Sequence, residues 1–237
     1  MRAKPTPRRS RRFPAIGFAV LSAIAAAAAA ASPAAAETLR FGGAGGAIAS
    51  TQVLAAAYSR SHPDVEFVVI GGLGSTGGIR GVRTNAIDFA ISGRPLKSDE
   101  MMPGLSIEPF AITPFVFAAN RGTSESHATT MAQAAAMFAG TVPTWPNGTP
   151  VRPVLRPASD SEAVELRSLS PQMRDAVDAA MARPGMLTSP TAQEHAEFLQ
   201  NLPGSFGAIA LVQVIAEKAR VDVLALDGVV PSPQTLA

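Results

Sequence analysis

Residues 38–78 carry the clearest fold signal in the chain, and their sequence is TLRF-GGAGG-AIASTQVLAAAYSRS-HPD-VEFVVI-GGLGSTGG. Short β-rich runs at Thr38–Phe41 and Val65–Ile70 enclose the segment Ile48–Ser61, which has apolar residues at helical spacing. A glycine-rich loop follows each of the two β-rich runs. Strands and helices in alternation predict an α/β fold with mainly parallel sheets.

The same alternation continues to the end of the chain. We expect strands at Ala86–Ser92, Phe110–Ala119, Val151–Arg156, Phe206–Val212 and Val221–Leu226, and helices at Thr129–Ala139, after Ser170-Pro171 and after Thr191. These helices carry recognisable end signals: a closing glycine at Gly140, a proline at the first position for Pro171, and a capping box for Thr191 with Glu194. A length of 237 residues suits one globular domain or two small ones.

Residues 1–36 have the pattern of an export signal. A basic segment precedes the uncharged stretch Phe13–Ala31, and the small residues Ala34–Ala36 after it suit a signal peptidase. We expect cleavage after Ala36 and a mature chain in the periplasm or otherwise outside the cytoplasm, with the Sec and twin-arginine routes both open. An uncleaved anchor is the alternative, but an alanine-dominated segment that contains Pro14 is a weak transmembrane helix.

Charge and composition exclude several classes of protein. Six of the 20 basic residues lie in the first twelve positions, so residues 37–237 carry 14 basic and 18 acidic residues, and we expect no nucleic-acid partner. The absence of cysteine excludes disulfides, thiolate nucleophiles and iron–sulfur clusters. His62, His127 and His195 are far apart and lack metal-ligand spacing, so we expect them to be exposed and expect no metal or other cofactor.

Three loops could together hold an anion. The loops Gly42–Gly46 and Gly71–Gly78 each join a strand to a helix, and such loops expose backbone N–H groups at the helix start. The third loop, Arg156–Glu162, adds an arginine and two serines; Ser159 and Glu162 have capping-box spacing, so Ser159 or Ser161 is expected to begin a helix. Each loop alone could be ordinary turn chemistry, and Arg156 alone could be a surface ion pair. Their joint occurrence favours a site for a small anion.

The ordered set of segments resembles the phosphate-type substrate-binding proteins of ABC transporters, a branch of the type II periplasmic binding proteins. The matching segments are Phe41–Ile48, Gly71–Val82, Ile87–Leu96, Phe138–Gly148, Arg156–Glu162 and Pro203–Ile209. The resemblance implies two α/β lobes that close over a ligand. It implies a first lobe at residues 37–117, a second lobe at 118–210, and a return to the first lobe at 211–237.

The resemblance also implies the ligand-binding residues. They are Gly46, Ala47 and Ile48 of the first loop, Ser75 and Thr76 of the second, Gly93 and Arg94, and Arg156, Ser159, Asp160 and Ser161 of the third. Ser75 matches a hydroxyl donor and Arg156 the charged donor of the family, whereas Ala47 stands where the phosphate binders usually have a hydroxyl.

Two departures from the family pattern bear on function. Gly93 stands where phosphate-specific members carry an aspartate, which accepts a hydrogen bond from a protonated phosphate and repels sulfate. Asp160 is the alternative acceptor; without one, Arg94 and Arg156 favour a fully ionised oxyanion or a carboxylate. The family chain also continues past the equivalent of residues 226–237, so we expect the C-terminal part of the first lobe to be incomplete.

We therefore expect an extracytoplasmic solute-binding protein, not an enzyme, that captures an inorganic oxyanion for an ABC transporter permease. Phosphate is the preferred ligand, and sulfate, molybdate and a carboxylate are alternatives. The resemblance implies a monomer. A divergent binding protein with a sensory or interaction role is the first rival. An exported phosphatase or hydrolase is the second, although no Gly-x-Ser-x-Gly elbow is present.

Overall fold

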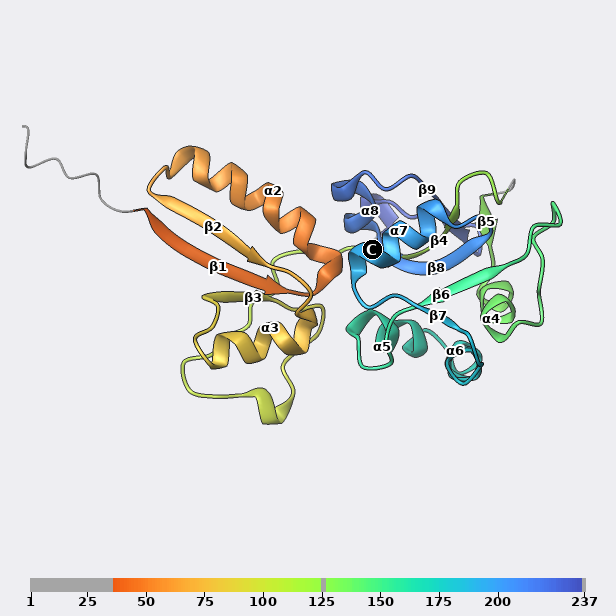
Figure 1. Cartoon of the computed structure of the whole chain (residues 1–237), viewed down its shortest axis with the longest axis horizontal. Coiled ribbons are helices and arrows are strands. Elements are labelled where there is room, and N and C mark those ends of the chain that lie inside the picture. The colour runs from red at the N-terminus through yellow and green to blue at the C-terminus, as the bar shows by residue number, and fades with distance from the viewer. Residues whose placement is uncertain (1–35, 125–126, 236–237) are drawn as a thin grey trace, which may run out of the picture. The chain divides into compact units, whose positions relative to one another are not determined.

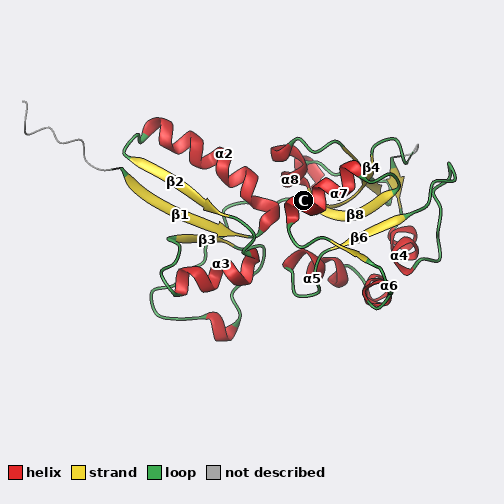
Figure 2. Cartoon of the chain, viewed as in Figure 1, coloured by secondary structure: helices red, strands yellow, loops and turns green. Residues whose placement is uncertain are grey.

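The computed structural model describes residues 36–124 and 127–235 (Figure 1). The export signal expected at residues 1–36 lies, except for Ala36, outside the described residues. Residues 37–237 form one compact unit in which helices and strands alternate along the chain (Figure 2). None of the helices in the described ranges is long and apolar enough to cross a membrane.

The N-terminal part of this unit is a three-stranded parallel sheet with the order β2-β1-β3. Its strands are β1 (Glu37–Gly43), β2 (Val65–Ile70) and β3 (Phe89–Ile91), joined by the helices α2 (Gly45–Ser61) and α3 (Gly74–Arg83). Phe41, Phe67 and Phe89 pack against one another, with the rings of Phe41 and Phe89 stacked at 5.0 Å. The strand, helix and strand predicted from residues 38–78 are confirmed.

The second sheet is larger and has the order β7-β6-β8-β4-β9. Its strands are β4 (Phe115–Asn120), β6 (Arg152–Leu155), β7 (Leu187–Thr188), β8 (Ser205–Ala210) and β9 (Val221–Val223). β6 runs parallel to β7 and β8, whereas β4 runs antiparallel to β8 and β9. A separate parallel pair joins β5 (Ala128–Thr129) to β10 (Ala225–Leu226).

Five helices pack around the second sheet: α4 (Met131–Ala139), α5 (Ser161–Ser168), α6 (Pro171–Met181), α7 (Ala192–Asn201) and α8 (Leu211–Glu217). The short 3₁₀ helices are Ser98–Glu100 and Pro233–Thr235. The predicted end signals are confirmed: Gly140 ends α4 at a φ of 81°, and the side chains of Ser170 and Thr191 accept backbone hydrogen bonds in the first turns of α6 and α7. Phe117, Phe138 and Phe206 lie at the centre of the core.

Several element boundaries differ from the sequence prediction. The strand expected at Phe110–Ala119 begins only at Phe115, because Pro109 and Pro114 lack the N–H groups that a strand ladder needs. The strand expected at Phe206–Val212 ends at Ala210, where α8 begins without a side-chain cap. The strand expected at Val221–Leu226 is divided into β9 and β10, which pair with different strands.

The division into lobes at residues 117 and 210 stays a prediction. The structure shows how the C-terminal segment packs: β9 pairs with β4, β10 pairs with β5, and α8 packs against α2. β9 is thus the last strand of the second sheet, β10 belongs to the separate pair with β5, and α8 contacts α2, the helix that follows β1.

Candidate functional site

The three loops singled out in the sequence meet at one cavity of about 250 Å³. Gly43 and Gly45 line it from the first loop and Gly72–Thr76 from the second. The third loop contributes Arg156, Pro157, Ser159, Asp160 and Ser161. A fourth segment, Pro190–Gln193, completes the wall, and no feature of the sequence had pointed to it. Ser75, Thr76, Arg156, Ser159, Asp160 and Ser161 are the predicted ligand-binding residues that line this first cavity.

Four helices begin at the first cavity. The first turns of α2, α3, α5 and α7 contribute Gly45, Ser75, Ser161 and Ala192 to its wall. Each helix start presents backbone N–H groups and the positive end of the helix dipole. α2 and α3 follow Ala44 and Leu73, whose side chains offer no acceptor for these N–H groups. Such a convergence suits an anion.

Ser75 connects the second and third loops. Its side chain is buried, and its hydroxyl Oγ donates to Ser161 Oγ at 3.3 Å and accepts from the backbone N–H of Gly93 at 3.1 Å. The structure therefore brings together three of the residues that the sequence selected. The neighbouring Thr76 Oγ1 accepts a hydrogen bond from Arg94 Nη2 at 3.0 Å.

Arg156 is the one basic residue among the described residues that line the first cavity. Its side chain is 7% exposed, its Nη2 lies 2.8 Å from Asp160 Oδ2, and its Nη1 donates to the backbone carbonyl of Ser189. Asp160 Oδ1 also accepts from the backbone N–H of Glu162, which makes Asp160 the N-cap of α5. The expectation that Ser159 or Ser161 begins this helix is confirmed for Ser161, its first residue, but the cap is Asp160 and not Ser159.

Glu162 is a second carboxylate beside the same guanidinium. Its Oε2 lies 3.5 Å from Arg156 Nε, and neither atom has a hydrogen-bond partner in the described part of the chain. Burial and the nearby charge of Asp160 raise the pKa of Glu162 to about 7, although Arg156 opposes this shift. The sequence had presented Glu162 only as part of a capping motif, so its place beside Arg156 was missed.

Arg94 does not line the first cavity. It forms two hydrogen bonds with Glu100, Nη2 to Oε1 at 2.6 Å and Nη1 to Oε2 at 2.7 Å. The hydrogen bond from Arg94 lowers the pKa of Glu100 to about 2. The geometry of Arg94 is that of a structural ion pair that also holds Thr76.

A second cavity, of about 290 Å³, adjoins the first through Ser161, which lines both. The predicted residues Gly46, Ala47 and Gly93 line this second cavity instead of the first. The other lining residues are Ala44, Thr113, Pro114, Phe115, Glu162, Glu165, Ala210 and Val212. Ile48 lines neither cavity, because its side chain packs in the core with Phe41 and Ile91.

His195 contradicts the expectation of exposed histidines. It is 1% exposed, its Nε2 lies 3.0 Å from the carbonyl oxygen of Ala208, and its Nδ1 lies 2.9 Å from Ser189 Oγ. Burial lowers the pKa of His195 to about 3, so the ring is neutral; Nε2–H then donates to Ala208 and Ser189 Oγ–H donates to Nδ1. Ser189 supplies the carbonyl that holds Arg156, so this buried pair supports the wall of the first cavity.

The apolar face of α7 offered a sequence signal for the burial of His195. Ala192, His195, Ala196 and Leu199 recur at helical spacing, and all four are buried.

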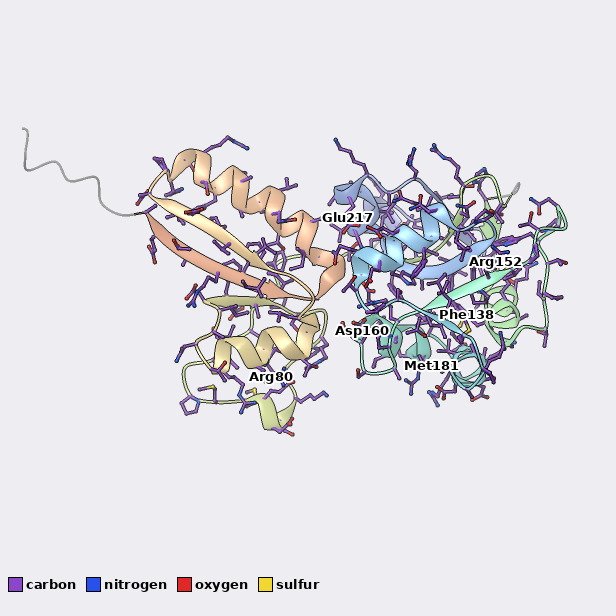
Figure 3. The ribbon with its side chains drawn as sticks, in the orientation of Figure 1. Arg80, Phe138, Arg152, Asp160, Met181 and Glu217 are labelled. Atoms are coloured by element: carbon purple, nitrogen blue, oxygen red, sulfur yellow. The ribbon has the colours of Figure 1, made fainter. Side chains whose placement is uncertain are left out.

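Contacts also link α2 to the helices of the second sheet. Gln193 Nε2 donates to the carbonyl of Gly45 and to Glu217 Oε1, both at 3.2 Å. Figure 3 labels Asp160, the residue just before α5, and Glu217 at the end of α8.

Comparison with known proteins identifies the family of the chain. The model of a family described as the PBP superfamily domain matches residues 28–230. A protein from Clostridium perfringens, described as a phosphate ABC transporter substrate-binding protein and solved with bound phosphate, is 17% identical with a TM-score of 0.63; the match covers 84% of this chain and 80% of that one. An ABC-type phosphate transport receptor from Vibrio cholerae is 19% identical with a TM-score of 0.54 over the same shares.

A reduced form of OxyR from N. meningitidis shares the fold as well, at 12% identity and a TM-score of 0.58 over 82% of each chain. No curated protein matches the sequence. The architecture expected from the sequence, an α/β fold of the two-lobed binding-protein type, is confirmed. Because the family model covers most of the described residues, the chain belongs to the PBP superfamily domain family.

Proposed function

We propose that this protein is an extracytoplasmic solute-binding protein that captures a phosphate-like oxyanion in the first cavity and delivers it to an ABC transporter permease. The observation that carries the proposal is the meeting of four helix starts and the buried Arg156 at one cavity. The relative from Clostridium perfringens, whose fold this chain shares, was solved with bound phosphate.

The expected binding energy comes from many modest contacts. A helix start stabilises an anion by about 0.3–1 kcal/mol, and a charge-assisted hydrogen bond from a guanidinium contributes about 1.5–3 kcal/mol. Ser75 and Ser161 add hydroxyl groups that donate or accept as the ligand requires.

Binding without covalent chemistry fits the serine and histidine pair that the structure contains. Ser189 and His195 lie within hydrogen-bond distance, as a nucleophile and its base would. Both side chains are buried, at 0% and 1% exposure, and neither lines the first or second cavity. We infer that this pair has a structural role and that a bound oxyanion is released unchanged.

A sensory role is the second candidate. The shared fold with OxyR shows that this architecture also occurs outside transport proteins. Under that reading the first cavity binds a ligand whose presence is reported to a receptor. Genes for a permease and an ATPase beside this gene favour transport, and their absence there favours the sensory role.

Titration calorimetry on the purified protein tests the proposal. Phosphate, sulfate, molybdate and a small carboxylate are titrated into the wild type, into Arg156→Ala, and into the matched control Arg174→Ala, which removes an exposed arginine of α6. We expect at least one oxyanion to bind the wild type and Arg174→Ala, and Arg156→Ala to bind it at least tenfold more weakly. Equal affinities of Arg156→Ala and the wild type would overturn the proposed site.

A further inference from the structure

The lining of the two joined cavities has more negative than positive charge. Arg156 and Asp160 line the first cavity, and Glu162 and Glu165 line the second. No basic residue is among the described residues that line the second cavity. The two linings together therefore hold one guanidinium and three carboxyl groups, of which Asp160 and Glu162 lie beside Arg156 and Glu165 is exposed; this excess is unfavourable for a ligand that carries only negative charge.

A buried acceptor beside Gly46 also lacks a donor among the described residues. Gln213 is 0% exposed, and its Nε2 donates to the carbonyl of Ala192 and to both carboxylate oxygens of Glu217. These three acceptors fix the orientation of the amide, so the other amide atom, Oε1, faces Gly46, which lines the second cavity. Gln213 Oε1 has no hydrogen-bond partner among the described residues. A buried carbonyl oxygen in this state needs a donor.

The rest of the second cavity suits a short apolar chain. Pro114, Phe115 and Val212 form much of its wall. Gly93 lies where the two cavities adjoin, and a Cβ atom placed there would lie 3.4 Å from Ser161 Oγ and 3.8 Å from Ser75 Oγ, which are ordinary contact distances. A side chain would fit at this position, so the glycine leaves that space free for a ligand.

We propose that the preferred ligand carries an ammonium group a few bonds from its oxyanion, as in an amino-substituted alkyl phosphonate or a phosphate monoester of an amino alcohol. This inference rests on the proposed function. The oxyanion lies in the first cavity at Arg156 and the helix starts. The alkyl chain passes Gly93 and Ser161, and the ammonium group donates to Glu165 and Glu162 in the second cavity.

Calorimetry with three matched probes tests the inference: 2-aminoethylphosphonate, ethylphosphonate and inorganic phosphate. The first two share one oxyanion and chain length and differ in the ammonium group. We expect 2-aminoethylphosphonate to bind at least tenfold more tightly than ethylphosphonate, because a charged hydrogen bond in a partly buried site contributes about that factor. Equal affinities for these two compounds would overturn the inference.

Two variants locate the effect. Glu165→Gln removes a carboxylate of the second cavity, and we expect it to reduce the ratio of the two phosphonate affinities severalfold. The matched control is Glu197→Gln, an exposed glutamate of α7 that lines neither cavity, and its ratio should equal that of the wild type. An unchanged ratio in Glu165→Gln contradicts the assignment of the ammonium group to the second cavity.

The outcomes also separate the two proposals. Tight binding of inorganic phosphate with weak binding of both phosphonates retains the oxyanion site and refutes the amino-substituted ligand. Failure of all three probes and of the oxyanions above to bind a folded sample refutes the proposed function itself.

Discussion

The buried carboxyl of Glu162 leads to a specific prediction about stability and pH. Its pKa is raised from 4.5 to about 7, first by burial and then by Asp160. A group whose pKa is higher in the folded protein holds its proton more tightly there, so its contribution to stability is complete below the unfolded pKa and is lost as the pH rises through the folded pKa. The loss is about 2.5 pK units at 1.36 kcal/mol each, or about 3 kcal/mol.

The perturbation is Glu162→Gln, which keeps the size and polarity of the side chain and removes its titration. The free energy of unfolding is measured by urea denaturation of the wild type and the variant at several values from about pH 4 to about pH 8. We expect the wild type to lose about 3 kcal/mol relative to the variant across this range.

His195 does not disturb the comparison. The pKa of His195 is lowered, so its effect has the opposite sign: stability is lost as the pH falls from the ordinary histidine pKa of 6.5 toward about 3. Both proteins contain His195, so its contribution cancels in their difference. Parallel stability curves for wild type and Glu162→Gln would refute the reasoning and would indicate that Arg156 keeps Glu162 ionised.

Three further predictions follow from single contacts. Gly43→Ala should destabilise the protein by more than about 2 kcal/mol in urea unfolding, because a Cβ there would collide with the backbone carbonyl of Ile91 at a φ of 135°. Its control, Gly104→Ala, meets no atom within 4 Å and should cost about 1 kcal/mol. Arg94→Ala should lower the urea midpoint and leave the ligand affinity within a few-fold of the wild type, because Arg94 is paired with Glu100; a large loss of affinity would restore Arg94 to the site. His195→Leu should lower the urea midpoint markedly at neutral pH, because it removes the hydrogen bond from Nε2 to the Ala208 carbonyl, while the Ser189 hydroxyl keeps the Leu155 carbonyl as an acceptor; an unchanged midpoint would contradict the network.

Local signals in the sequence predicted much of the fold correctly. The helix starts at Ser170 and Thr191 and the helix end at Gly140 depend on residues a few positions apart, which a sequence displays directly. α8 lacked such a signal, because it begins after Ala210 in an apolar run that continues from β8. Short apolar runs suit strand and helix equally, so the prediction extended the strand too far.

The charged residues of the site show which contacts local sequence patterns could not predict. Arg156 and the two glycine loops could be selected because they occur together after strands in one chain, although each alone has an ordinary structural explanation. The family resemblance implied that Arg94 binds the ligand. In the structure its side chain pairs with Glu100, which lies six residues later in a 3₁₀ helix. Glu162 and His195 were missed because their burial arises from packing between helices and strands that are distant in sequence.

Arg156 is the residue on which both proposals depend. Its guanidinium already holds Asp160, the carbonyl of Ser189 and, more loosely, Glu162. An oxyanion that enters the first cavity adds a further negative group to this set, and the repulsion is stronger than at an exposed site because Arg156, Asp160 and Glu162 are largely buried. The repulsion falls if Glu162 holds a proton, as its raised pKa favours, or if the ligand brings its own cation to Glu162 and Glu165. Burial is the main cause of the raised pKa of Glu162, and the charge of Asp160 adds to it. The same excess of carboxylates over guanidinium groups is the reason why an oxyanion that carries its own ammonium group would suit these two cavities.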